Sequence, residues 1–118
     1  MNTDFEDYLD SEAFDEKQAL VGTFTCFWTD EDDQAQFLGI KLNSSPDRTC
    51  VVPAILGTAD EHQSCILIRA REQDIARAPS LGCDEQLDKK LEEQIYLHFE
   101  LTAPNSRHEL HINRSHAD

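Results

Sequence analysis

Short runs of alternating apolar and polar residues, separated by turn residues, fill the chain from residue 20 to residue 70. This period of two predicts antiparallel strands that turn one face toward a core. We expect the strands at 20–29, 36–42, 49–56 and 64–70, with turns at 30–33, 43–47 and 57–63. Pro53 lies inside the third run, and proline cannot donate to a strand ladder. This strand therefore belongs at an edge of the sheet or at a bulge.

Two segments show helical spacing instead. Phe5, Leu9 and Ala13 recur at i, i+4 and i+8, which predicts a helix over residues 3–18. Leu87 and Leu91 lie at i and i+4 behind a run of acids, which predicts a second helix over 84–94. Both helices would dock on the sheet through their apolar sides.

Beyond residue 94 the period returns to two, which predicts a strand at 95–102 and a short one at 110–112. Together these elements predict an α+β fold: a mostly antiparallel sheet of about six strands in hairpin order, with one or two helices. Strong bending could close the sheet into a small barrel. We expect a single domain over 1–118, with an N-terminal acidic helix at 1–18, a sheet core at 19–114 and a tail at 115–118.

The elements alone predict an ordinary small domain, whereas the charge indicates a candidate binding protein. The 118 residues include 24 acidic and 10 basic ones, a net charge of −14, whereas a magnitude of about 2–8 suits the solubility of a small domain. Residues 1–33 hold a net charge of −10 and residues 34–118 only −4. Such a surface repels nucleic acid and anionic lipid and attracts basic partners. We therefore expect no direct contact with nucleic acid or a membrane.

The predicted partner-binding face combines carboxylates of the N-terminal helix with those of the first hairpin turn. Its residues are Asp7, Asp10, Glu12, Asp15, Glu16, Asp30, Glu31, Asp32 and Asp33. Tyr8 and Phe14 stand among these acids and are candidate contacts, since aromatic side chains anchor interfaces. The competing interpretation is a solvated acidic face that only keeps the protein soluble.

Motifs for catalysis, cofactors or metals are missing from the sequence. The acids at 30–33 resemble the start of a calcium loop, but Ala35 stands where that loop needs glycine and Lys41 where it needs glutamate. His98, His108 and His111 could meet on neighbouring strands, although surface histidines are the simpler interpretation. We expect no enzyme activity, no cofactor and no metal.

The cysteines bear on the cellular compartment. They stand at 26, 50, 65 and 83 without a C-x-x-C pair, and the N-terminus is acidic rather than shaped like a secretory signal. We expect all four to be reduced, small core side chains, and the protein to be cytoplasmic.

In size and charge, and in its spaced carboxylates, the chain resembles the small acidic DNA-mimic proteins of bacteria, including the neisserial type that binds the histone-like protein HU. The resemblance implies a cytoplasmic monomer that occupies the basic DNA-binding surface of such a partner. Two other functions fit the same acidity. One is an immunity protein or antitoxin that neutralises a basic nuclease, and the other is an acidic secretion chaperone that works through apolar grooves on a dimer.

Overall fold

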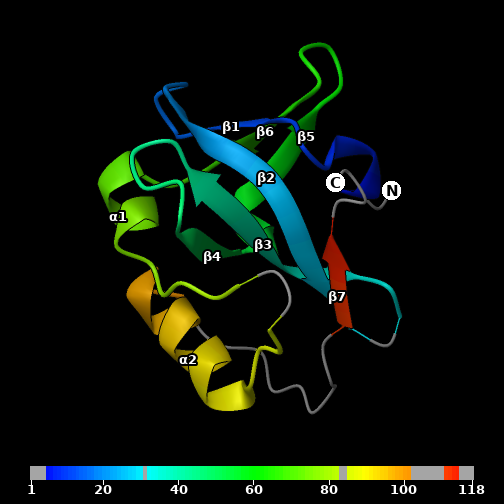
Figure 1. The fold of residues 1–118 in the computed structure, drawn as a ribbon, viewed down its shortest axis with the longest axis vertical. Coiled ribbons are helices and arrows are strands. Elements are labelled where there is room, and N and C mark those ends of the chain that lie inside the picture. Colours follow the sequence, from blue (N-terminus) through cyan, green and yellow to red (C-terminus); the bar gives the residue numbers. More distant parts are fainter. Residues whose placement is uncertain (1–4, 31, 83–84, 102–110, 115–118) are drawn as a thin grey trace.

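The fold is built on one curled sheet, with α1 (Glu72–Ala76) and η1 (Phe5–Tyr8) packed against its inner core and α2 (Lys89–His98) against its outer core (Figure 1). The structure, a computed structural model, describes residues 5–30, 32–82 and 85–101 and the backbone of 111–114. The strands are β1 Glu12–Phe14, β2 Leu20–Thr29, β3 Ala35–Leu42, β4 Thr49–Pro53, β5 Gly57–Asp60, β6 Cys65–Ile68 and β7 His111–Arg114. The helical segments are the 3-10 turns η1 Phe5–Tyr8 and η2 Ala54–Leu56, and the α-helices α1 Glu72–Ala76 and α2 Lys89–His98. The predicted α+β class is confirmed.

The strands follow the order β4-β3-β2-β1-β6-β5, in which only the pair of β1 and β6 is parallel. β2 is the longest strand and has three neighbours. β3 lies along one edge of β2, while β1 and β7 share the other edge, at residues 20–23 and 26–29 of β2. A register shift between Phe24 and Cys26 interrupts the β2–β3 ladder. Such a bulge bends a strand, and here it lets β2 serve both halves of the sheet.

The sheet bends but does not close. β4 and β5 are its two ends, and they are linked along the chain only by η2, without a ladder between them. The alternative of a closed small barrel is therefore wrong. Pro53 is the last residue of β4, so the edge position predicted for its strand is confirmed.

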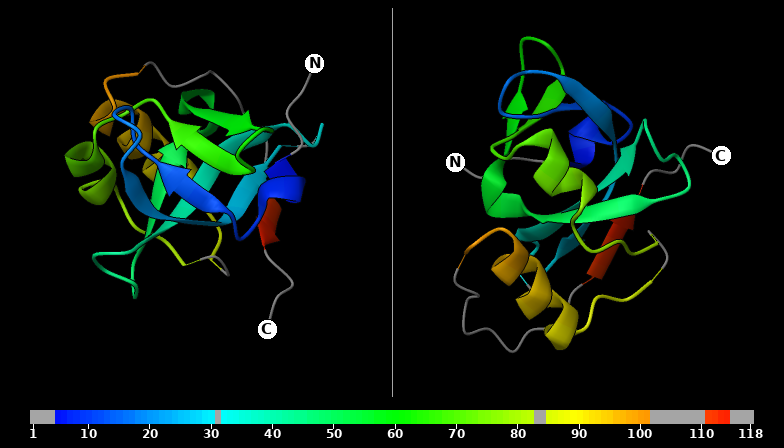
Figure 2. Two further views of the ribbon diagram at one scale, coloured as in Figure 1. Left: turned by 90° about the horizontal axis from the view of Figure 1, so that it is seen from above. Right: turned by 90° about the vertical axis from the view of Figure 1, so that its left-hand side faces the viewer.

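Two cores lie on opposite sides of β2, β3 and β4. Inside the curl, Phe24, Leu38 and Ile40 pack with Ala13 and Ile66 from the other half of the sheet. On the outside, a second cluster packs under α2, and its members are Cys26, Trp28, Phe37, Val51, Leu87, Ile95 and Tyr96. Figure 2 shows α2 at the end of the molecule away from β1, β5 and β6. Within the part of the chain that the structure describes, no helix lies over the outer face of these last three strands.

The predicted helix over 3–18 is wrong beyond its first turn. η1 ends at Tyr8, Asp10 has a φ of 72°, and β1 follows at Glu12–Phe14. The backbone pairs with β2 instead: Asp10 N donates to Phe24 O at 2.7 Å and Phe24 N donates to Ser11 O at 2.9 Å. An isolated helix with a face of like charges is weak, so long-range strand pairing prevails. Phe5 and Ala13 are still buried, as the apolar spacing required.

The predicted strand at 95–102 is also wrong, because α2 runs on to His98. Ile95 and Tyr96 are both buried, whereas Leu97 keeps 76% of its surface exposed. Adjacent buried residues followed by an exposed one fit a helical period and not a period of two. The second helix thus exists but lies four to five residues later than predicted.

The remaining predictions divide between success and error. β2 has the predicted bounds, and the hairpins that join it to β3 and β3 to β4 are confirmed. The predicted turn at 57–63 is wrong in its first half, where β5 pairs with β6, and right at 61–63; Ser64 belongs to the turn and not to the strand predicted at 64–70. The short C-terminal strand is present as β7, whereas the predicted tail at 115–118 lies outside the described residues.

Candidate functional site

The structure divides the predicted acidic face between distant parts of the molecule. Glu16 lies in the β1–β2 turn, while Asp32 and Asp33 lie in the β2–β3 turn, at the opposite end of the ten-residue β2 (Figure 1). A strand of that length spans on the order of 30 Å. Asp7, Asp10 and Glu12 are exposed near η1 and β1, and Glu31 lies outside the described residues. A single helical row of carboxylates does not form.

Two of the predicted binding residues, Asp15 and Asp30, stabilise turns instead. Asp15 is only 5% exposed, and its Oδ1 accepts hydrogen bonds from Lys17 N at 2.9 Å and Ala19 N at 2.8 Å. It therefore holds the turn between β1 and β2. Asp30 is half-buried and does the same at the β2–β3 turn, where it accepts three hydrogen bonds from residues 32, 34 and 36. Neither carboxylate is displayed to a partner.

Outward-facing apolar and acidic side chains do lie together on another surface. It is the outer face of the half-sheet of β1, β5 and β6, which no described helix covers. In β1, Ala13 faces the core, so Glu12 and Phe14 face outward. In β6, Ile66 and Ile68 face the core and Leu67 faces outward. The left view in Figure 2 looks onto this half-sheet.

The register aligns the outward side chains in two rows across the strands. Phe14 is the pairing partner of both Leu20 on β2 and Leu67 on β6. These three form an apolar row in which Leu20 is 43% exposed and the other two are half-buried. Glu12 lies two residues before Phe14 on β1, and Asp60 lies two residues after Thr58, the β5 partner of Leu67, so the two carboxylates form an acidic row beside the apolar one. We call these five residues, Glu12, Phe14, Leu20, Asp60 and Leu67, the open sheet face.

Further carboxylates lie at one end of the open sheet face, around Tyr8. Partial burial raises the pKa of the Tyr8 phenol, and so do the nearby carboxylates of Glu61, Asp7 and Asp60. Burial raises the pKa of the Cys65 thiol too, with contributions from Asp60 and Glu12. The carboxylates that raise these pKa values belong to η1, β1 and the β5–β6 turn. These three segments therefore form one negative region. We call Asp7, Asp60 and Glu61 the acidic end.

Asp60 and Glu61 were not among the predicted binding residues. The reason is that the β5–β6 turn reaches η1 only through the parallel pairing of β1 with β6, which a local pattern does not reveal. Asp60 also caps its own turn, since its Oδ1 accepts hydrogen bonds from His62 N at 3.0 Å and Gln63 N at 3.3 Å. An aspartate at the start of a polar four-residue turn was the available signal for this hairpin.

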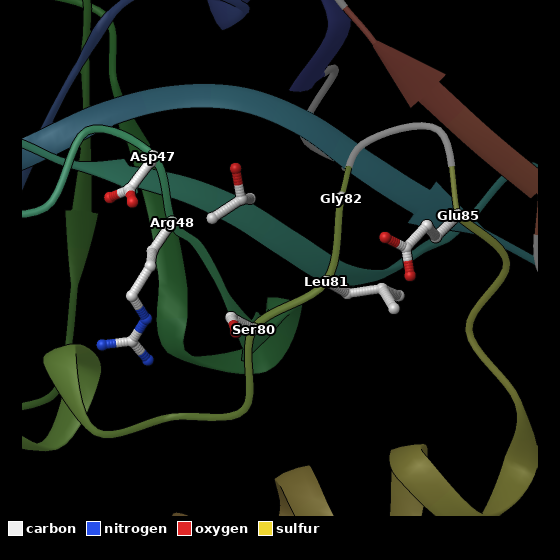
Figure 3. Close-up of a pocket in the computed structure, with 7 residues that line it drawn as sticks. Asp47, Arg48, Ser80, Leu81, Gly82 and Glu85 are labelled. Carbon is white, nitrogen blue, oxygen red and sulfur yellow. The ribbon is translucent and has the colours of Figure 1, made fainter.

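A separate hollow of about 270 Å³ lies beside the edge strand β4 (Figure 3). It is lined by Asp47, Arg48, Thr49, Ser80, Leu81, Gly82 and Glu85. The Arg48 guanidinium points away from it and donates to the carbonyls of Ala76 at 3.2 Å and Ala78 at 3.5 Å. Among the described residues, the lining therefore offers hydroxyls and carboxylates without a histidine, cysteine or lysine to act with them.

The cysteines differ from the expectation that all four are reduced. Cys26 is disulfide-bonded, while Cys50 and Cys65 are free and buried. Cys83 lies outside the described residues. The expectation rested on spacing along the chain, which does not limit bonds between segments that meet only in the fold. Burial raises the pKa of the Cys50 thiol, which belongs to the inner core, and that of the Cys65 thiol, which lies on β6 near Asp60 and Glu12.

Among the described residues, the structure shows no metal centre of the kind that the histidines could have formed on neighbouring strands. The Nε2 atom of His98 lies 2.8 Å from the carbonyl oxygen of Asp74, and its ring packs edge-on against Phe99. His108 and the side chain of His111 lie outside the description. Among described side chains, no group of three or more His, Cys, Asp or Glu could hold a metal ion.

Within residues 5–30, 32–82, 85–101 and 111–114, no helix is long and apolar enough to cross a membrane. Comparison with protein-family models and with curated protein sequences finds no match to this chain.

Proposed function

We propose that this protein binds a basic protein surface and occupies it in place of nucleic acid, as DNA-mimic proteins do. It acts by binding and carries out no reaction. The partner class is a basic DNA-binding protein of the bacterial nucleoid, with the histone-like protein HU as the model case. The protein works as a monomer.

The observation that carries the proposal is excess negative charge. The chain has a net charge of −14, and among pairs in which both side chains are described, the ion pair is that of Arg71 with Asp74 at 3.2 Å. Carboxylates that are not neutralised within the protein raise the local concentration of basic partners and speed their association. The acidic end and the open sheet face supply such groups on one side of the molecule.

A competition experiment tests this proposal. A labelled DNA duplex is bound to an HU-type protein, and its fluorescence anisotropy is followed as the acidic protein is added. We expect displacement of the duplex at low salt and steep loss of displacement as salt rises, because exposed charges beyond about 10 Å are screened at 0.1 M. Absence of displacement at any salt concentration would contradict the proposal.

A charge-matched pair of variants locates the effect. The first variant combines Asp7→Asn, Glu12→Gln and Glu61→Gln, which removes three charges from the proposed surface. The control combines Asp32→Asn, Glu72→Gln and Glu93→Gln, three exposed acids elsewhere. Surface charges act mainly on encounter, so the first variant should slow association more than it speeds dissociation, and the control should change both rates less.

The alternatives predict other outcomes in the same assay. An immunity protein would inhibit a basic nuclease and leave HU-bound DNA in place. A secretion chaperone would dimerise and bind apolar segments with little dependence on salt.

A nucleoid partner requires the cytoplasmic location that the sequence predicts, and we propose this location together with the partner. Disulfides are uncommon in cytosolic proteins, so the Cys26 disulfide has to persist there against cytosolic reductants.

A further inference from the structure

The open sheet face carries apolar side chains as well as charges. Its apolar row, Leu20, Phe14 and Leu67, lies on three adjacent strands. A pure mimic of phosphates would need no such row. Interfaces between proteins, in contrast, place apolar side chains at the centre and charges around them.

We propose that the open sheet face is the docking site for an amphipathic basic helix of the partner. This inference rests on the proposed function and specifies the element that the partner contributes. The leucine-type side chains of that helix would cover the apolar row, and its lysines or arginines would face Glu12, Asp60 and the acidic end.

The spacing of the rows suits such a helix. Neighbouring strands lie about 4.8 Å apart, so the apolar row extends over roughly 10 Å from Leu20 to Leu67. Successive turns of an α-helix are 5.4 Å apart, so a helix lying across the strands presents one apolar side chain to each of them. The acidic row is displaced by two residues along the strands, roughly 7 Å. That offset matches the flank of a helix seated on the apolar row.

Charge complementarity selects this occupant over a second copy of the same chain. Two copies meeting through this face would gather the carboxylates of Glu12 and Asp60 from both chains in one interface, with Asp7 and Glu61 close by. Like charges held together in a partly dry interface are strongly unfavourable. A basic helix removes this repulsion and leaves the apolar contact intact.

The test uses a synthetic peptide as the partner. The probe is an acetylated leucine–lysine peptide of about 18 residues, long enough to form a helix, with leucines at i, i+3, i+4 and i+7. The control peptide has the same composition in an order that forms no apolar face. Amide chemical shifts of the full-length protein are followed by NMR during the titration. We expect the changes to concentrate in β1, β6 and the start of β2, and the amphipathic peptide to bind more tightly than its control.

Two variants sharpen the test. Leu20→Gln removes an exposed contact of the open sheet face and should weaken the amphipathic peptide by about tenfold. Leu97→Gln alters a more exposed leucine on α2 and should leave the dissociation constant within about twofold. Equal binding of the two peptides, shifts confined to another surface, dimerisation through this face, or an unaffected Leu20→Gln variant would each overturn the inference.

The peptide experiment and the DNA competition fail separately. If the protein displaces DNA from an HU-type protein but neither peptide maps to the open sheet face, the docking inference is wrong and the proposed function stands. If the amphipathic peptide maps to the face but no DNA is displaced, the docking site stands and the proposed function is wrong.

Discussion

Carboxylates that look alike in the sequence have different roles in the structure. Asp15 and Asp30 are turn caps whose oxygen atoms accept backbone and side-chain hydrogen bonds. Asp32 lies in the same turn as Asp30 and is exposed. An aspartate within two to four residues of free N–H groups tends to satisfy them itself, so position within a turn decides its role.

The first prediction concerns Asp30. Its Oδ1 accepts from Asp32 N at 2.9 Å and Gln34 N at 3.0 Å, and its Oδ2 accepts from Gln36 Nε2 at 3.0 Å. Asp30→Ala should lower the free energy of unfolding by about 1–3 kcal/mol, because three partners of a charged group lose it. Asp32→Ala, in the same turn, should change the free energy by less than about 0.5 kcal/mol. Urea denaturation of both variants measures this, and equal effects would show that Asp30 is not the cap.

The second prediction concerns Cys26. Alkylation of the unfolded, unreduced protein should modify the peptides containing Cys50 and Cys65 and leave the peptide containing Cys26 unmodified. Reduction before alkylation should then expose Cys26 to the reagent. Peptide mass spectrometry distinguishes the two states, and modification of Cys26 without reduction would restore the expectation of reduced cysteines.

At the scale of elements, the decisive case is the segment that follows residue 88. Asp88 caps α2, with its Oδ1 accepting from Leu91 N at 2.8 Å. The helix then buries Ile95 over Trp28 and Phe37, whereas its sequence alternates well enough to suggest a strand. Tertiary contact with the outer core, together with the cap, outweighs that local alternation.

A pair of alanine substitutions discriminates between helix and strand. Ile95→Ala should destabilise the protein by about 2–5 kcal/mol, since it opens a cavity under α2. It should also shift the fluorescence of Trp28, the only tryptophan, to longer wavelength. Leu97→Ala should cost less than about 0.5 kcal/mol. In a strand these two residues would share a face, so similar effects would favour the strand.

At the scale of the whole molecule, excess negative charge acts together with buried groups that resist ionisation. Burial raises the pKa of Cys50 and Cys65 above the ordinary 9.0, and that of Tyr8 and Tyr96 above 10.0. Between the unfolded and folded values, the folded state binds more protons than the unfolded state. The contribution of these groups to the free energy of unfolding is therefore fully present at lower pH and is lost as pH rises through this range.

The fourth prediction follows from the direction of this pH dependence of stability. The urea midpoint should stay level between about pH 7 and pH 8 and should fall above about pH 9, as the thiols and then the phenols ionise in the unfolded chain. Cys50→Ala removes one of the buried thiols and should reduce the slope of the decline. A midpoint that rises above pH 9 would contradict the assignment.

The sequence by itself determined the central hairpins of the sheet and the edge position of β4. Each depends on period-two alternation, on turn residues next to it in the chain, or on the missing donor of Pro53. These are local properties, so the bounds of β2 could be predicted to the residue. The acidity that motivates the proposed function is likewise a property of composition.

Only the tertiary structure decided the fate of the N-terminal segment and the place of the candidate site. Phe5 and Ala13 have helical spacing, yet β2 offers residues 10–14 a ladder that an isolated acidic helix cannot match. The parallel pairing of β1 with β6 then brings Glu12 beside Asp60 and aligns Phe14 with Leu67. Contacts between residues so far apart in the chain leave no periodic signal, because they depend on how the whole sheet curls.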